Sequence, residues 1–139
     1  MADLSLRKID AETAAQHLSR ESLCGPKGKP RECDPGFFTE EVKAGRMAAV
    51  GFFLAGDHIA SVALGACEGQ TGKELEINAL SGDVENVELI SEGLGLLEEW
   101  AKTKGFAQMR FHTFRRGLMA ISDKRGWYPS EIVMKKVFT

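Results

Sequence analysis

Residues 73–113, KELEINALSGDVENVELISEGLGLLEEWAKTKGFAQMRFHT, decide the fold. The first part, Lys73–Ser81, alternates in the manner of a β-strand, with Leu75, Ile77 and Ala79 on one face and Glu76, Asn78 and Leu80 on the other. Val84–Lys104 is predicted to be a helix, because one apolar stripe recurs at spacings of three and four: Val87, Ile90, Leu94, Leu97 and Ala101. Gly105 is placed to end this helix, and a second strand is expected over Ala107–Thr113.

The flanking sequence adds shorter elements on both sides of this unit. Asp10 is placed to cap the first helix, whereas three prolines and three glycines mark a loop. Before residue 73 we expect a strand Leu4–Ile9, a helix Ala11–Leu23, the loop Cys24–Gly36, a short helix Phe38–Arg46, and a hairpin of Met47–Leu54 and Ile59–Cys67. After residue 113 we expect a helix Arg116–Arg125 closed by Gly126 and a last strand Glu131–Phe138.

This order of elements predicts one α/β (α+β) domain spanning residues 1–139. Runs of strand come first and alternating strand and helix units follow. The chain should therefore form a mixed, mostly antiparallel central sheet of about six strands, with helices on both faces.

Composition excludes several broad classes of protein. The 18 basic and 20 acidic side chains give a net charge of −2, which argues against a general nucleic-acid or membrane-surface binder. The longest run free of charged or hydrogen-bonding side chains, Met47–Gly56, is half the length needed to cross a bilayer. The odd cysteine of three must stay unpaired, and the cysteines and histidines lack the spacing of a zinc site. We expect a soluble cytoplasmic protein without a bound metal.

Three segments resemble the GNAT acyltransferase superfamily, and the element order resembles it as well. Glu76-Ile77-Asn78-Ala79-Leu80 is similar to that family's central strand, and Leu96–Phe106 is similar to the end of its main helix. Asp123-Lys124-Arg125-Gly126-Trp127, followed by Val133–Lys136, is similar to its closing helix and last strand. The resemblance implies a GNAT-like fold, acetyl-CoA as donor, and a small-molecule or protein amine as acceptor. A homodimer stays open as an alternative to a monomer.

The resemblance breaks at the cofactor's pyrophosphate. The family holds it on backbone N–H groups of a glycine-rich turn that opens the main helix, where the free N–H groups and the helix dipole favour an anion. Counting from either side places those glycines within residues 86–92, and that stretch contains none. The segment instead carries four carboxylates and no basic residue, which would repel a phosphate: Asp83, Glu85, Glu88 and Glu92.

The resemblance also suggests site residues. Glu76 lies where a general base would stand beside the amine, and the backbone N–H groups of Ala79, Leu80 and Ser81 would contact the thioester carbonyl. Ser122 occupies a position where the family often has a tyrosine that protonates the departing thiolate, and a hydroxyl of serine is a poorer acid. Charge segregation adds a further pair, because residues 110–125 hold five basic side chains and one acidic one: Arg115 or Arg116 could hold phosphates in place of the missing turn.

Two functions are compatible with these features. One is an acetyl-CoA-dependent N-acetyltransferase with an atypical pyrophosphate site. The other is a GNAT-fold protein without catalytic activity that serves as a binding, regulatory or structural component, for example of a phage or mobile element. The acidic helix start and Ser122 favour the second function, whereas the strand and helix segments favour the fold without deciding between the two.

Overall fold

The computed structural model describes residues 3–113 and 115–138. The strands within these residues are β1 (Leu4–Ile9), β2 (Ala48–Leu54), β3 (Asp57–Gly69), β4 (Gly72–Gly82) and β5 (Gln108–Phe111). The helices are α1 (Ala11–Leu18), α2 (Phe37–Lys43), α3 (Val87–Thr103) and α4 (Arg116–Asp123), with a single 3-10 turn, η1 (Glu21–Leu23).

The five strands form one mixed sheet in the order β1-β2-β3-β4-β5. The first four are antiparallel neighbours, and β5 runs parallel to β4 after the crossover through α3. The chain therefore has an α+β fold with a mixed, mostly antiparallel sheet, as the sequence predicts.

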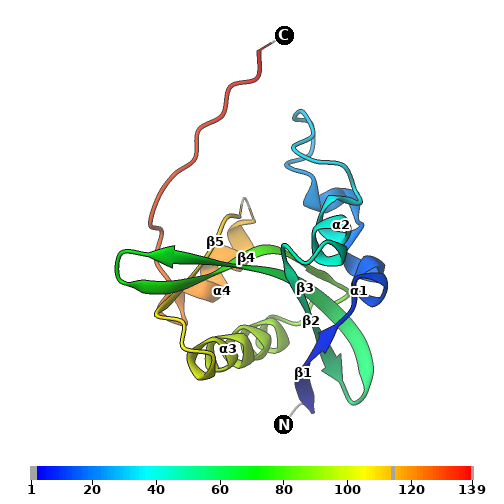
Figure 1. Ribbon diagram of the computed structural model, residues 1–139, viewed down its shortest axis with the longest axis vertical. Helices are drawn as coiled ribbons and strands as arrows, with labels where there is room; N and C mark the ends of the chain where they lie inside the picture. Colours follow the sequence, from blue (N-terminus) through cyan, green and yellow to red (C-terminus); the bar gives the residue numbers. More distant parts are fainter. Residues whose placement is uncertain (1–2, 114, 139) are drawn as a thin grey trace.

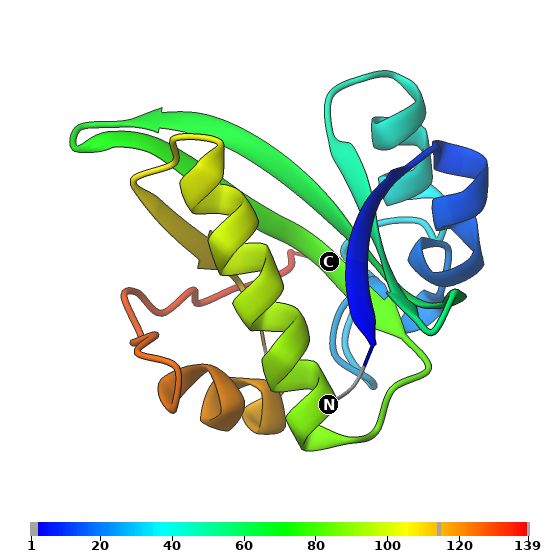
Figure 2. The same ribbon diagram turned by 90° about the horizontal axis from the view of Figure 1, so that it is seen from below.

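Helices cover both faces of the sheet (Figures 1 and 2). On one face α3 packs Leu97 and Ala101 against a core that includes Val62 and Ile77. On the other face α1 packs Ala14 and Leu18 against small strand residues, Ala49, Ala63 and Ala79, and α2 adds Phe38 and Val42. In the described part of the chain, no helix is both long enough and apolar enough to cross a membrane.

Local signals in the sequence place most element ends well. Asp10 caps α1 by accepting the N–H of Thr13 at 2.8 Å, and Gly105 takes a φ of +83° just after α3. The hairpin turn lies at Ala55-Gly56, where φ is positive at both residues. The first helix is shorter than expected, because α1 ends at Leu18 and the chain then turns through η1.

The alternation expected along β4 is wrong beyond Ile77. Ala63 pairs with Ala79 but Leu64 pairs with Ile77, so Asn78 is an extra residue that forms a β-bulge. A bulge shifts the phase of the strand by one residue. Ala79 consequently faces α1 rather than sharing a face with Ile77, and Leu80 packs in the core beneath α3.

The expected last strand Glu131–Phe138 does not form, so the described residues give five strands rather than about six. Residues 128–138 have no regular structure and run away from the sheet (Figure 1). Five large apolar side chains on this segment are more than half exposed: Ile132, Val133, Met134, Val137 and Phe138. Alternating apolar residues give the segment the propensity of a strand, but without a neighbouring strand its backbone stays unpaired.

Candidate functional site

A gap opens in the sheet where β4 and β5 separate. Their parallel pairing runs from Glu74 and Gln108 to Ile77 and Phe111 and stops at the Asn78 bulge. Ala79, Leu80 and Ser81 still pair with β3 but no longer with β5. Because backbone groups of a strand point alternately to its two edges, this stretch presents free N–H and C=O groups to the gap.

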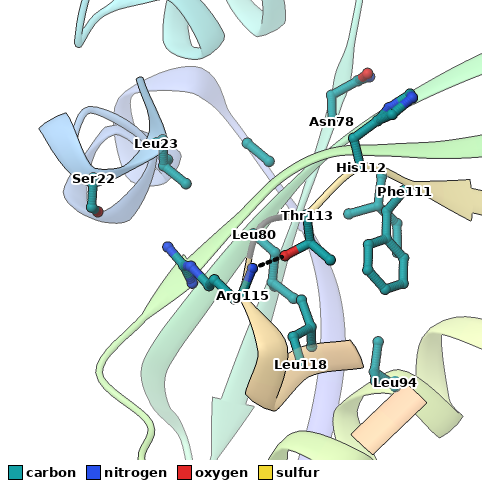
Figure 3. A pocket seen from close by; sticks show the side chains of 12 residues that line it. Ser22, Leu23, Asn78, Leu80, Leu94, Phe111, His112, Thr113, Arg115 and Leu118 are labelled. Atoms are coloured by element: carbon teal, nitrogen blue, oxygen red, sulfur yellow. Dashed lines mark hydrogen bonds between the residues drawn. The ribbon is translucent and has the colours of Figure 1, made fainter. Parts of the chain in front are cut away.

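A cavity of about 90 Å³ lies in this gap. Since a water molecule takes about 30 Å³ of liquid volume, the cavity has room for a few waters, and it is open to solvent on one side. Side chains from both strands, from α3 and α4, and from η1 line it (Figure 3): Ser22, Leu23, Ile77, Asn78, Ala79, Leu80, Leu94, Phe111, His112, Thr113, Arg115 and Leu118.

An acid–base pair stands beside this cavity. His112 follows β5 directly, and its Nδ1 lies 3.9 Å from Oε1 of Glu76 on β4. Figure 3 shows the His112 ring and the Asn78 amide side by side, pointing to the same side of the sheet. Glu76 is 30% exposed and His112 is 51% exposed, so an incoming molecule can reach both.

Neighbouring charges hold this corner of the sheet in place. Arg110 donates to Oε1 of Glu74 at 3.2 Å and also binds Glu131, which follows α4. The hydrogen bond to Glu74 raises the pKa of Arg110, with further contributions from the surrounding carboxylates. Glu74 and Glu131 are thus both bound by the same guanidinium, which also lies 3.5 Å from Nε2 of His112. Glu131 is 4.0 Å from that nitrogen, and Glu76 faces Nδ1 on the other side of the ring.

Arg115 supplies the positive charge at the mouth of the cavity. Its backbone N–H donates to Oγ1 of Thr113 at 3.0 Å, and its side chain extends toward η1 (Figure 3). Arg116 is the first residue of α4 and is exposed, but it is not part of the cavity lining.

The start of α3 does not fit a pyrophosphate. Asn86 caps the helix with its own side chain, whose Oδ1 accepts the N–H of Leu89 at 3.0 Å. Asp83 lies just before it and binds Arg20 at 2.8 Å. Glu85 and Glu88 add further carboxylates, so an anion would meet negative charge at a helix end that is already capped.

The predicted site residues are therefore only partly brought together. Ala79, Leu80 and Arg115 line the cavity, and Glu76 lies beside it against His112. Ser81 is buried next to this group.

Ser122 is buried inside α4, and its hydroxyl donates to the backbone oxygen of Leu118 at 2.8 Å. Ser122 is not among the residues that line the cavity, and its hydroxyl proton is used in this hydrogen bond within α4.

His112 is the residue that sequence reasoning missed. The chain has three histidines, and the importance of this one depends on the parallel register that places Ile77 opposite Phe111. The sequence offers one signal for this role: His112 follows a predicted strand, and Glu76 lies on another. That signal becomes useful only when the two strands are known to be parallel neighbours.

Comparison with solved structures identifies the fold. A candidate acetyltransferase from Clostridium difficile 630 aligns over 98% of this chain and 97% of its own, with a TM-score of 0.71 and 14% identity. A predicted acetyltransferase with acetyl-CoA from Clostridium acetobutylicum aligns over 96% of both chains, with a TM-score of 0.65 and 14% identity. A GCN5-related N-acetyltransferase from Ralstonia eutropha JMP134 aligns over 96% of this chain and 98% of its own, with a TM-score of 0.65 and 17% identity.

These similarities show that the chain has the GNAT superfamily fold, as the resemblance in the sequence implies. No family model matches the sequence, and no curated protein matches it. At this level of identity the comparison establishes the architecture, and the chemistry has to be argued from the residues of this chain.

Proposed function

We propose that this protein is an N-acetyltransferase that transfers an acetyl group from acetyl-CoA to an amine. The observation that carries the proposal is the gap between β4 and β5, where unpaired backbone groups, a cavity and an acid–base pair meet. Acetyl-CoA would supply the acetyl thioester at this place.

The backbone of Ala79, Leu80 and Ser81 is the part of the chain that fits the acyl end of such a donor. N–H groups on an unpaired strand edge are preorganised hydrogen-bond donors, which favour negative charge developing on a carbonyl oxygen. Because backbone groups make these contacts, the side chains at these positions can vary without loss of the donors.

Arg115 is the residue that fits the phosphates of the donor. Its guanidinium stands at the mouth of the cavity, and a guanidinium can bind phosphate oxygens through two parallel hydrogen bonds. In this proposal it compensates for the helix start of α3, which lacks glycine and carries carboxylates.

Glu76 and His112 serve the amine. The ring of His112 carries a nitrogen that can accept a proton, so His112 can take the proton that an attacking ammonium group must lose. Glu76, 3.9 Å away, would orient the ring and stabilise its protonated form. At 3.9 Å this contact is longer than a hydrogen bond, and catalytic contacts of this kind often shorten when substrate binds.

A second function has one observation in its favour. The capped, acidic start of α3 is a poor site for pyrophosphate, as a GNAT-fold protein that only binds a partner would allow. Such a protein would keep the gap in the sheet as a consequence of its fold, without turnover.

An acetyl-transfer assay separates the two functions. The release of free CoA thiol from acetyl-CoA would be followed with a panel of primary amines, using the full chain. Amine-dependent thiol release that falls at least tenfold in Glu76→Gln supports the transferase. Absence of release with every amine, by a protein that is folded by circular dichroism, supports the second function.

A further inference from the structure

The loop between η1 and α2 brings two cysteines together. The N–H of Glu32 donates to the backbone oxygen of Cys24 at 2.7 Å, so the two ends of the loop lie side by side. Gly25 permits this approach: its φ is +121°, and a Cβ there would stand 3.1 Å from Cγ of Glu32. Cys33 is the next residue after this contact.

The backbone contact between Cys24 and Glu32 brings the two thiols near each other. Cys33 is partly buried, and the side chain of Cys24 is 4% exposed. Burial, the neighbouring Cys24 and the nearby carboxylates together raise the pKa of the Cys33 thiol to about 11. Cys67 is exposed on β3 and serves as an isolated thiol for comparison.

We propose that Cys24 and Cys33 form a reversible intramolecular disulfide when the protein meets a hydroperoxide. One thiolate attacks a peroxide oxygen and breaks the O–O bond, which gives a sulfenic acid and, after proton uptake, water. The second sulfur then displaces the hydroxyl of the sulfenic acid, which leaves as a second water. The two thiols lose two hydrogen atoms in total, and the peroxide is reduced to two waters.

The disulfide would act on the wall of the cavity. Ser22 and Leu23 line the cavity and directly precede Cys24, so a cross-link to Cys33 ties this wall to the end of the loop. The bond closes a loop of ten residues, which limits the unfolded chain and stabilises the fold. This inference concerns thiol chemistry and stands whether or not the cavity binds an acyl donor.

The test treats the full reduced chain with hydrogen peroxide, blocks free thiols with an alkylating agent under denaturing conditions, and analyses peptides by mass spectrometry without reduction. We expect a peptide pair joined through Cys24 and Cys33, with Cys67 left outside that bond. The unfolding temperature should rise by several degrees on oxidation and return to its starting value after a reducing agent is added. The rate should increase with pH, because the thiolate is the reactive form.

Cysteine variants test which thiols form the bond. Cys33→Ser, at a partly buried position, should remove both the cross-linked peptide and the thermal shift, whereas Cys67→Ser should keep both. Cys24→Ala gives a second check from the buried side. Recovery of Cys24 and Cys33 as separately alkylated or overoxidised thiols would overturn the proposal, and so would bonds that join either of them to Cys67 or to another chain.

Discussion

Nδ1 of His112 lies 3.9 Å from Oε1 of Glu76, between β4 and the edge strand β5 of the sheet. Glu76 lies in the paired stretch of β4, opposite Arg110, and His112 follows Phe111, the last residue of β5 that is paired with β4. The imidazole and the carboxylate therefore stand beside the cavity that begins where the pairing ends. This pair links the fold to the proposed chemistry.

Replacing either member of the pair should slow turnover without unfolding the protein. We expect Glu76→Gln and His112→Asn each to reduce kcat for acetyl transfer at least tenfold, because the proton of the amine loses its acceptor or the acceptor loses its orientation. Steady-state kinetics with a responsive amine measure the effect. Both side chains are partly exposed, so the free energy of unfolding should change little.

Glu68→Gln is the matched control for this pair. Glu68 is an exposed carboxylate near the end of β3, at the tip of the hairpin with β4. Its replacement removes one negative charge and leaves the surroundings of the cavity intact. Equal kcat values for Glu76→Gln and Glu68→Gln would remove Glu76 from the mechanism.

Arg115→Ala should weaken binding of acetyl-CoA. A charge-assisted contact to phosphate contributes about 1.5–3 kcal/mol, and the exposure of this side chain places the loss toward the lower end, roughly a tenfold rise in Kd. Titration calorimetry would measure it. Lys124→Ala, which removes a positive charge just after α4, is the control, and the same loss in both variants would mean a general charge effect rather than a contact.

Glu98 on α3 contacts residues that follow α4, and it should make the free energy of unfolding depend on pH in the acidic range. It accepts from Nε of Arg125 at 2.9 Å and from Nε1 of Trp127 at 3.1 Å. Burial pushes the pKa of Glu98 upward, but these hydrogen bonds and the charge of Arg125 outweigh it and lower the pKa below 4.5. The contribution of Glu98 to the free energy of unfolding is therefore complete above pH 4.5, and it is lost as the pH falls through the lowered pKa.

Glu98→Gln should cost about 1 kcal/mol of unfolding free energy at neutral pH, because the charged part of the interaction with Arg125 is lost. Denaturant unfolding at several pH values would show the variant approaching the parent protein in acid. Glu99→Gln, in a pair that is about 70% exposed on both sides, should change stability far less. A constant difference between Glu98→Gln and the parent from neutral to acidic pH would contradict this account.

His17 should make the fold less stable in mild acid. It is completely buried, Nδ1 lies 2.8 Å from Oγ of Ser61, and Ser61 also contacts Nε2 of His58 at 2.8 Å. Burial lowers the pKa of His17, with repulsion from His58 and Arg20 adding to it and Asp83 opposing it.

Because the folded state resists protonation of this ring, the unfolded state binds the proton first. Stability is therefore complete above the ordinary value of 6.5 and declines as the pH falls from there toward the lowered pKa. His17→Gln should flatten this part of the profile of Tm against pH, although the variant itself is less stable. A profile of unchanged slope in His17→Gln would exclude His17 as the source.

The order of elements could be predicted because it depends on local signals. Asp10, the glycines at the turns and the apolar stripe of α3 each act within a few residues of where they stand. The bulge at Asn78 could not be predicted in this way, since an extra residue in β4 is defined only by its register against β3. The alternation of the strand therefore reverses at Asn78, although no residue pattern within Lys73–Ser81 predicts the reversal.

The site is harder to predict because it depends on contacts between distant segments. The resemblance predicts Glu76, Ala79 and Leu80 as site residues, and the excess of basic residues around Arg115 predicts a phosphate contact there. The partner of Glu76 was missed because His112 is 36 residues away. The contact of Cys33 with Cys24 likewise depends on how the loop folds back. The alternation of residues 131–138 gives a propensity for a strand, but it does not supply a neighbour.

Thermal unfolding of the full chain, with and without millimolar acetyl-CoA, tests the central claim most directly. A ligand at about 100 times its Kd stabilises the folded state by roughly 2.7 kcal/mol, on the order of several degrees for a domain of this size. The account predicts such a rise, and a clearly smaller one in Arg115→Ala. An unfolding temperature that acetyl-CoA leaves unchanged would contradict the proposed acetyltransferase.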